Sequence, residues 1–251
     1  MPLTGKIAIV TGGSRGIGRA IVDRMLADRV AVLTCGRGAR PPDLNSAAIW
    51  VQADVSKSAD AEKIVAAAQE KVGPVSILVN NAGVQVEKTI VDTSDEDWNL
   101  VMGVNAKGTF NMCRAALPHM AKNGGAIVNI GSISGLVSDP SLALYNASKA
   151  FVHGLTRSIA VDHGPNVRCN AVCPGWIATA MAEDAFALAG DPAKAMSDAL
   201  VRHPAGRFGY PTDIAAIVRW LVSDEAAFVT GQCFTVDGGL TAASPIQPRL
   251  F

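Results

Sequence analysis

Short apolar runs alternate along the chain with longer segments in which apolar residues recur every three to four positions. The short runs are typical of buried strands and the longer segments of amphipathic helices. We predict strands at residues 6–11, 30–35, 48–53, 75–80, 126–131, 166–172 and 232–236. We predict helices at residues 16–28, 58–72, 95–122, 143–162 and 211–222. Because alternating strands and helices form parallel β-α-β units, we expect an α/β fold with one doubly wound parallel sheet of about seven strands and helices on both faces.

Two segments depart from this alternation. Residues 38–45 join the second and third predicted strands, where a helix is usual, but Pro41-Pro42 prevents a regular helix. We therefore expect a short loop at this crossover. Residues 180–207 form an additional alanine-rich segment, which Gly190-Asp191-Pro192 interrupts. No linker-like stretch divides the sequence, so we predict a single domain over residues 1–251.

Composition and charge narrow the class of protein. Hydrophobic residues make up 49% of the 251 positions and charged residues 18%, which is typical of a globular protein with a sizeable core. Lys plus Arg and Asp plus Glu both number 22, so the chain lacks the excess positive charge of a nucleic-acid binder or of a protein that docks on anionic membranes. No apolar run is long enough to span a bilayer, and residues 1–6 lack the apolar core of a signal peptide, so we expect a cytoplasmic protein.

The cysteines and histidines show no spacing typical of metal ligands. The five cysteines, none of them in a C-x-x-C pair, are Cys35, Cys113, Cys169, Cys173 and Cys233. The four histidines are likewise not spaced as zinc ligands. We therefore expect the cysteines to be small buried side chains in a reducing compartment, with no disulfide and no metal site.

A glycine-rich turn lies between the first predicted strand and the first predicted helix. Gly12, Gly16 and Gly18 give the spacing G-x-x-x-G-x-G. Glycines allow a tight turn and let the backbone approach a pyrophosphate closely, while the free N–H groups at the start of the helix favour an anion. The turn therefore predicts a dinucleotide site at the carboxyl end of the first strand.

Tyr145 and Lys149 are four residues apart at the start of a predicted helix, so their side chains share one helical face. A tyrosine ordinarily ionises near pH ~10, and a fixed cation beside it favours the phenolate. Ser132 follows the predicted strand at 126–131 and can place a hydroxyl at its carboxyl end. The phenol and the hydroxyl together can hold a carbonyl oxygen and transfer a proton to it.

With these motifs the sequence resembles the short-chain dehydrogenase/reductase family from about Leu3 to Gly239. The matching motifs, in family order, are Thr11-Gly12-x-x-x-Gly16-Ile17-Gly18, Asp54-Val55, Asn80-Asn81-Ala82-Gly83, Asn105, Ser132, Tyr145-x-x-x-Lys149, Pro174-Gly175-x-Ile177-x-Thr179 and Asp237-Gly238-Gly239. The resemblance implies a Rossmann-type fold and a lid over the substrate at residues 180–207. The catalytic residues that it implies are Asn105, Ser132, Tyr145 and Lys149.

The resemblance also assigns residues to a nicotinamide cofactor. The implied contacts are Gly12, Ser14, Arg15, Ile17, Gly18, Arg37, Asp54, Val55, Asn81, Ala82, Gly83, Tyr145, Lys149, Pro174, Gly175, Ile177 and Thr179. Family members that use NAD carry an Asp at the place of Gly36, where it would repel a 2′-phosphate. Here Arg37 follows that glycine and Arg15 lies in the glycine turn, and two guanidinium groups suit a phosphate monoester. We therefore predict NADP(H) as the cofactor.

The predicted activity is an NADP(H)-dependent interconversion of a ketone or other carbonyl with a secondary alcohol, by hydride transfer with Tyr145 as general acid and base. The resemblance implies that Lys149 lowers the Tyr145 pKa and that Asn105 organises a water-linked proton path to Lys149. The candidate walls of the substrate pocket are Leu136, Val137, Leu144, Trp176, Ile177 and Phe186. Their mixed but mainly apolar character favours a small-molecule ketone or secondary alcohol over a charged sugar acid.

Three other functions stay open. Reductases of 3-oxoacyl groups on an acyl carrier protein or CoA share these motifs, but a carrier protein needs a basic docking patch. The turns at residues 122–126 and 162–166 carry one fixed positive charge, on Lys122. A polyol or sugar dehydrogenase is the second alternative. The third is a non-catalytic NADP-binding regulator, against which the intact catalytic set argues.

The resemblance further implies a homotetramer or a homodimer. Apolar residues recur at helical spacing at Phe151, Leu155 and Ile159 and at Val218, Leu221 and Val222. Residues 231–236 are a predicted edge strand, which a monomer would leave exposed for pairing. The tail at residues 245–251 ends in apolar residues, and we expect it to lie across a neighbouring subunit.

Overall fold

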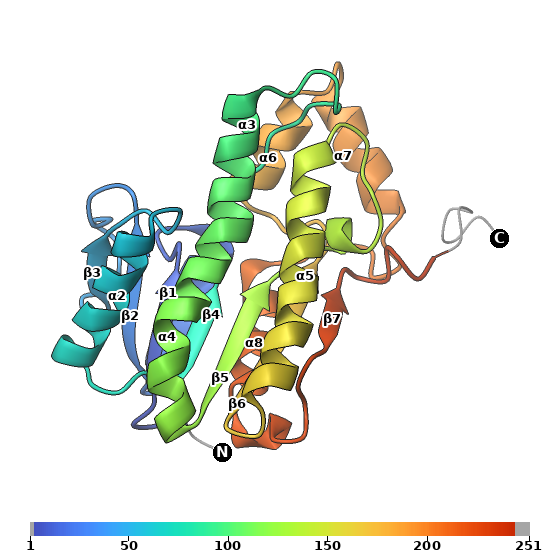
Figure 1. Ribbon diagram of the computed structural model, residues 1–251. Coiled ribbons are helices and arrows are strands. Elements are labelled where there is room, and N and C mark those ends of the chain that lie inside the picture. Colours follow the sequence, from blue (N-terminus) through green and yellow to red (C-terminus); the bar gives the residue numbers. More distant parts are fainter. Residues whose placement is uncertain (1–2, 244–251) are drawn as a thin grey trace.

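The computed structural model of the protein describes residues 3–243. In this part of the chain seven parallel strands form one sheet (Figure 1). The strands are β1 (Ile7–Thr11), β2 (Ala31–Gly36), β3 (Ile49–Gln52), β4 (Ile77–Asn80), β5 (Gly125–Ile130), β6 (Val167–Pro174) and β7 (Cys233–Val236). Their order is β3-β2-β1-β4-β5-β6-β7, and all neighbours are parallel. The winding direction therefore reverses between β1 and β4, where such sheets open a crevice beyond the carboxyl ends of their strands.

Helices cover both faces of this sheet (Figure 1). They are α1 (Gly16–Ala27), α2 (Ser58–Lys71), α3 (Asp95–Val101), α4 (Thr109–Asn123), α5 (Ala143–His163), α6 (Ala180–Ala187), α7 (Pro192–Val201) and α8 (Pro211–Leu221). α1 and α8 pack side by side on one face, while α2, α4 and α5 cover the other. α6 and α7 lie beyond the carboxyl ends of the strands. The predicted α/β fold is thus confirmed.

Alternate residues of each strand face the two helical layers. In β1, Ile7 and Ile9 join the core that α2, α4 and α5 complete, whereas Ala8 and Val10 join the core under α1 and α8. All four side chains are buried. Strands that are buried on both faces have continuous apolar sequences, and this is why short apolar runs predicted them.

The predicted strands agree with the observed ones to within two residues at each end. Residues 37–48 contain no helix, as Pro41-Pro42 predicted. The single helix predicted at 95–122 is instead α3, a π-helix at Met102–Gly108, and α4 in one continuous rod. The π segment is a local change of hydrogen-bond pattern inside a continuous helical rod, which apolar periodicity alone does not reveal. Residues 180–207 contain α6 and α7.

One apolar surface that we expected to serve assembly lies inside the subunit. Val218, Leu221 and Val222 are at most 1% exposed, because α8 packs against the sheet and α1. Their interpretation as an assembly face is therefore wrong. On α5, Ile159 also belongs to the core, whereas Phe151 is 42% exposed.

β7 lies at the edge of the sheet, as predicted. The expected role of the tail at 245–251 falls outside the described residues. Among residues 3–243, no helix combines the length and the apolarity that crossing a membrane requires.

Candidate active site

A cavity of about 560 Å³ lies beyond the carboxyl ends of the central strands. Every residue that the sequence assigns to the cofactor lines this cavity. Ser132 lines it together with Tyr145 and Lys149, and Asn105 is the one predicted catalytic residue that does not. The fold therefore brings the glycine turn and the Tyr-Lys pair, which are far apart in the sequence, to one place.

The glycine turn is held against the end of β4. Gly12 has a φ of +69° and Gly16 a φ of +57°, in the left-handed region that favours glycine. A Cβ atom on Gly18 would lie 2.3 Å from the carbonyl oxygen of Gly12. The Asn81 amide donates to the carbonyls of Thr11 at 2.9 Å and Gly12 at 3.2 Å. Helix α1 begins with no side-chain cap and no acidic residue in its first turn, so its first N–H groups suit an anion.

The end of β2 is crowded beside Gly36, so an acidic side chain there would have to displace the Trp50 indole. A Cβ atom on Gly36 would lie 2.7 Å from Cη2 of Trp50, so the indole fills the space beside that glycine. Arg15 and Arg37 both line the cavity. Neither arginine forms a salt bridge with a residue of the described part of the chain. The guanidinium groups of Arg15 and Arg37 are thus available to bind an anion in this part of the cavity.

Arg40 differs from these two arginines although it lies in the same loop as Arg37. Its guanidinium donates to the carbonyls of Leu44, Asn45 and Ala48 at 2.8 to 3.1 Å. It does not line the cavity. Arg40 therefore holds the short crossover that replaces a helix.

Asp54 follows β3 and presents a carboxylate to the cavity. Its Oδ1 accepts hydrogen bonds from the Ser56 N–H at 3.0 Å and the Ser56 hydroxyl at 2.8 Å. Burial alone would raise the pKa of Asp54, but these hydrogen bonds and the charge of Arg37 hold it below its ordinary value. Asp54 is therefore a hydrogen-bond acceptor at neutral pH and suits an amino group.

Tyr145 and Lys149 lie on one face of α5, with Lys149 Nζ 5.5 Å from the centroid of the Tyr145 ring. Lys149 is only 5% exposed, and its Nζ donates to the Ile130 carbonyl at the end of β5 at 2.8 Å. Ser132, two residues further along the chain, is also buried. The end of β5 thus holds the lysine and presents the serine hydroxyl beside the phenol.

Burial dominates the ionisation of the Tyr-Lys pair. It raises the pKa of Tyr145 to about 12, an effect that the Ser132 hydroxyl opposes and the Asp139 charge reinforces. It lowers the pKa of Lys149 to about 8. Burial thus has a larger effect on the Tyr145 pKa than the Ser132 hydroxyl has, and the lowering of that pKa by Lys149 stays a prediction. At neutral pH the phenol is protonated and can donate a proton.

Asn105 lies outside the cavity but joins two elements that border it. It is buried on the π-helix. Its Oδ1 accepts from the Val84 N–H at 2.9 Å, and its Nδ2 donates to the Val84 carbonyl at 2.9 Å and to Ser148 Oγ at 3.0 Å. A Cβ atom on Gly83 would lie 3.4 Å from Asn105 Oδ1 and 3.7 Å from Lys149 Nζ, so the two side chains flank that glycine.

Comparison with known proteins agrees with this geometry. A sequence model of the protein family described as "Enoyl-(Acyl carrier protein) reductase" matches residues 12–241. The chain belongs to the short-chain dehydrogenase/reductase family. The family prediction made from the motifs is thus confirmed, and it relates the chain to oxidoreductases over nearly its whole length.

Three individual proteins illustrate the similarity. The NADP-dependent (R)-specific alcohol dehydrogenase of Lentilactobacillus kefiri is 39% identical over 252 positions, which cover 96% of this chain and 98% of the relative. The 3-oxoacyl-[acyl-carrier-protein] reductase of Thermotoga maritima is 36% identical, with 96% and 99% covered. The ligand-free structure of the Thermoplasma acidophilum aldohexose dehydrogenase superposes with a TM-score of 0.93 at 35% identity and 98% coverage of both chains.

In this short-chain dehydrogenase/reductase the substrate pocket differs in part from the prediction. Trp176 and Ile177 line the cavity. The remaining predicted walls, which do not line it, are Leu136, Val137, Leu144 and Phe186. Leu136 and Val137 are about half exposed. Phe186 supports the wall from behind, since its ring stacks on Trp176 with centroids 4.5 Å apart.

Three polar residues that sequence reasoning missed also line the cavity: Gln85, Ser134 and Asp139. The Ser134 N–H donates to Ser132 Oγ at 3.1 Å, and the Ser134 hydroxyl donates to Asp139 Oδ2 at 3.0 Å. Ser134 thereby orients the Ser132 hydroxyl. In the sequence, only the positions of these three residues between the family motifs indicated that they lie near the site.

Proposed function

We propose that this protein is an NADP(H)-dependent oxidoreductase that interconverts a ketone or other carbonyl compound with a secondary alcohol. The observation that carries the proposal is one cavity that contains both an anion-binding glycine turn and the Ser132, Tyr145 and Lys149 side chains. When bound, NADP(H) supplies the group that donates or accepts the hydride. The side chains of this protein then have to bind the substrate oxygen and move one proton.

In carbonyl reduction the substrate oxygen accepts hydrogen bonds from the hydroxyls of Tyr145 and Ser132. The protonated phenol gives its proton to that oxygen while the carbonyl carbon receives the hydride, and Tyr145 is left as a phenolate. The buried Lys149 ammonium stabilises this phenolate. In alcohol oxidation the proton moves back to Tyr145. Asn105 and Lys149 flank Gly83, where a bridging water would exchange the proton with solvent.

The residues around the cavity suit the separate parts of NADP(H). The first N–H groups of α1 would hold the pyrophosphate, and Arg15 and Arg37 would pair with the 2′-phosphate. Asp54 would accept from the adenine amino group. By family resemblance, Ile177 and Thr179 would engage the nicotinamide carboxamide. The name of the L. kefiri relative, which states NADP dependence, supports this choice of cofactor.

The substrate is proposed by class only. The apolar wall of Trp176, Ile177 and Met181 favours a small ketone or secondary alcohol. Reduction of 3-oxoacyl thioesters and oxidation of polyols or sugars are the catalytic alternatives, and the names of the T. maritima and T. acidophilum relatives include such activities. The cavity-lining Gln85 and Asp139 offer polar partners for additional hydroxyl groups.

We also propose a lid over the substrate, a homo-oligomeric state and a cellular compartment. Residues 180–207 would close over the substrate, since the first turn of α6 already lines the cavity. A homotetramer or homodimer would form through α4 and α5, where Phe110 and Phe151 are 40% and 42% exposed, and through the edge strand β7. The protein would act in the cytoplasm, where its cysteines stay reduced.

Absorbance of the reduced nicotinamide tests the proposal. The purified protein is mixed with NADPH or NADH and a panel that contains small ketones, a 3-oxoacyl thioester and an enoyl thioester, and with NADP⁺ and a set of sugars and polyols. The proposal expects NADPH consumption with a ketone and a lower kcat/KM with NADH. Turnover of thioesters or sugars alone would favour the corresponding alternative. NADPH binding without turnover of any compound would favour a non-catalytic regulator.

A further inference from the structure

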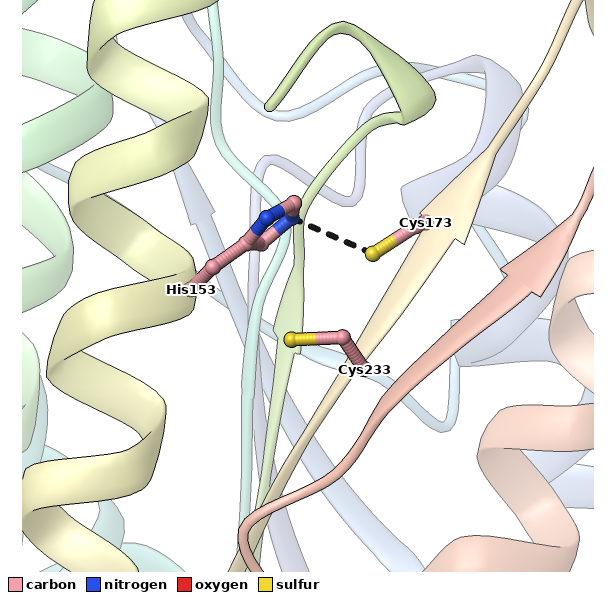
Figure 2. A group of neighbouring side chains, drawn as sticks. All are labelled: His153, Cys173 and Cys233. Carbon is pink, nitrogen blue, oxygen red and sulfur yellow. Dashed lines mark hydrogen bonds between the residues drawn. The ribbon is translucent and has the colours of Figure 1, made fainter. Parts of the chain in front are cut away.

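Three potential metal ligands lie together behind the proposed active site (Figure 2). His153 comes from α5, Cys173 from β6 and Cys233 from β7, and their donor atoms all lie within 4.8 Å of one another. His153 Nε2 is 3.1 Å from Cys173 Sγ. His153 and Cys173 are buried and Cys233 is half-buried. Sequence spacing does not reveal this cluster, and our expectation of no metal site did not include it, because its members come from three separate elements.

Packing of the three elements explains the juxtaposition. β6 and β7 are paired in the register that sets Ala171 opposite Cys233, so Cys173, two residues on, faces the same side of the sheet. α5 packs on that side. Gly131 leaves room for the imidazole, since a Cβ atom on that glycine would lie 2.4 Å from His153 Nε2. The imidazole ring of His153 is therefore closely packed against the backbone at Gly131.

The register argues against a disulfide between the two cysteines. Strands lie about 4.8 Å apart and rise about 3.3 Å per residue, so an offset of two residues separates the Cα atoms by about 8 Å. A disulfide requires Cα atoms less than about 7 Å apart. A cation makes no such demand, because two thiolates and one imidazole around it are separated from each other by roughly 3.5 to 4 Å. The observed spread of donor atoms is close to that arrangement.

The donors and their neighbours fit a soft divalent cation. Two thiolates would balance its charge, and imidazole with thiolate is a donor set that suits Zn²⁺. Cys233 is half-buried on the edge strand β7, so one member of the cluster lies near the surface of the subunit.

We propose that His153, Cys173 and Cys233 form a binding site for Zn²⁺ or a similarly soft divalent cation, with one coordination position left for water. His153 follows Lys149 by one helical turn, and Cys173 directly precedes the cavity-lining Pro174. A bound cation would join α5, β6 and β7 immediately behind the catalytic side chains. Its role is to hold these elements together, and it does not contact the substrate.

Metal binding can be measured without any enzyme assay. Full-length protein is freed of metal with a chelator under reducing conditions and then titrated with Zn²⁺ alone, followed by calorimetry, and with Co²⁺ alone, followed by absorbance. The site predicts a single ion per chain and a sulfur-to-cobalt charge-transfer band. Cys233→Ser and His153→Gln should each weaken binding by more than about tenfold, the minimum effect of even an outer-shell change at such sites.

Cys35→Ala is the matched control, because Cys35 is also buried but lies on β2, outside the cluster. It should leave the affinity and the charge-transfer band unchanged. Absence of stoichiometric binding would overturn the proposal, as would binding that survives in both cluster variants once circular dichroism shows them folded. A Cys173–Cys233 disulfide in the non-reduced protein, detected by mass spectrometry, would overturn it as well.

Discussion

The Trp50 indole lies against Gly36, with Cη2 only 2.7 Å from the place where a Cβ atom on that glycine would stand. Gly36 ends β2, the position at which an acidic residue would contact the adenosine ribose. Trp50 lies on the neighbouring strand β3. Steric crowding therefore disfavours an acid at this end of the cavity, where the charges of Arg15 and Arg37 favour an anionic ligand.

Gly36→Asp alone should destabilise the protein without creating activity with NADH. The new side chain would clash with the indole, and overpacking of this kind typically costs about 1–3 kcal/mol. Combining it with Trp50→Leu should relieve the clash and raise kcat/KM for NADH. Thermal unfolding and kcat/KM with both cofactors measure the two effects. A stable Gly36→Asp single variant that prefers NADH would contradict the steric argument.

Arg37→Gln should lower kcat/KM for NADPH by about 10- to 100-fold, because a hydrogen bond between charged groups contributes about 1.5–3 kcal/mol. The value for NADH should change little, since NADH has no 2′-phosphate. Arg40→Gln is the matched control, because Arg40 bonds only to backbone carbonyls of the loop among its described contacts. It should reduce stability and keep the cofactor preference. Equal losses with both cofactors in Arg37→Gln would contradict the assigned role.

Because of Lys149, the free energy of unfolding should increase as the pH rises above about 8. Its pKa is lowered from 10.5 to about 8, so between these values the unfolded chain holds a proton that the folded protein has lost. Stability increases with pH wherever the unfolded state binds more protons, and the full effect is on the order of 3 kcal/mol. Tyr145, whose pKa is raised to about 12, opposes this only above pH ~10.

Denaturant unfolding of the wild type and of Lys149→Met, at several pH values between ~7 and ~10 and with a chelator present, measures this effect. The wild type should gain stability relative to the variant as the pH rises. Parallel pH profiles for the two proteins would show that Lys149 titrates normally in the fold.

Phe151→Glu should dissociate the oligomer or lower its mass, because it places a charge in the apolar surface of α5 that we assign to assembly. Leu188→Glu is the control, since Leu188 is 68% exposed and follows α6, so it belongs to neither α4 nor α5. Light scattering reports the mass of each protein. A monomeric wild type, or an oligomer that Phe151→Glu leaves intact, would contradict the assignment.

Local sequence patterns predicted most of this molecule. Buried parallel strands require apolar runs, and the glycine turn, the Asp54-Val55 pair and the Tyr145-Lys149 pair are short motifs whose geometry is set by adjacent residues. Features set by distant residues were missed. The apolar face of α8 could not be assigned to the core or to a partner until its own sheet was seen to cover it.

The same limit explains the other differences. The raised pKa of Tyr145 depends on the surroundings that the fold gives the phenol, which helical spacing does not report. Trp50 meets Gly36 only through the pairing of β2 with β3. His153, Cys173 and Cys233 meet only after α5 packs on β6 and β6 pairs with β7.

The most direct test of the proposed mechanism is the turnover of Tyr145→Phe on a ketone that the wild type reduces. The change removes the proton donor and keeps the ring, so NADPH affinity and the unfolding temperature should stay close to those of the wild type. Loss of a general acid typically lowers the rate by about 10²–10⁴-fold, and we expect kcat to fall by that amount. A kcat near the wild-type value, in single-turnover experiments that exclude rate-limiting product release, would contradict the role of Tyr145 as the proton donor.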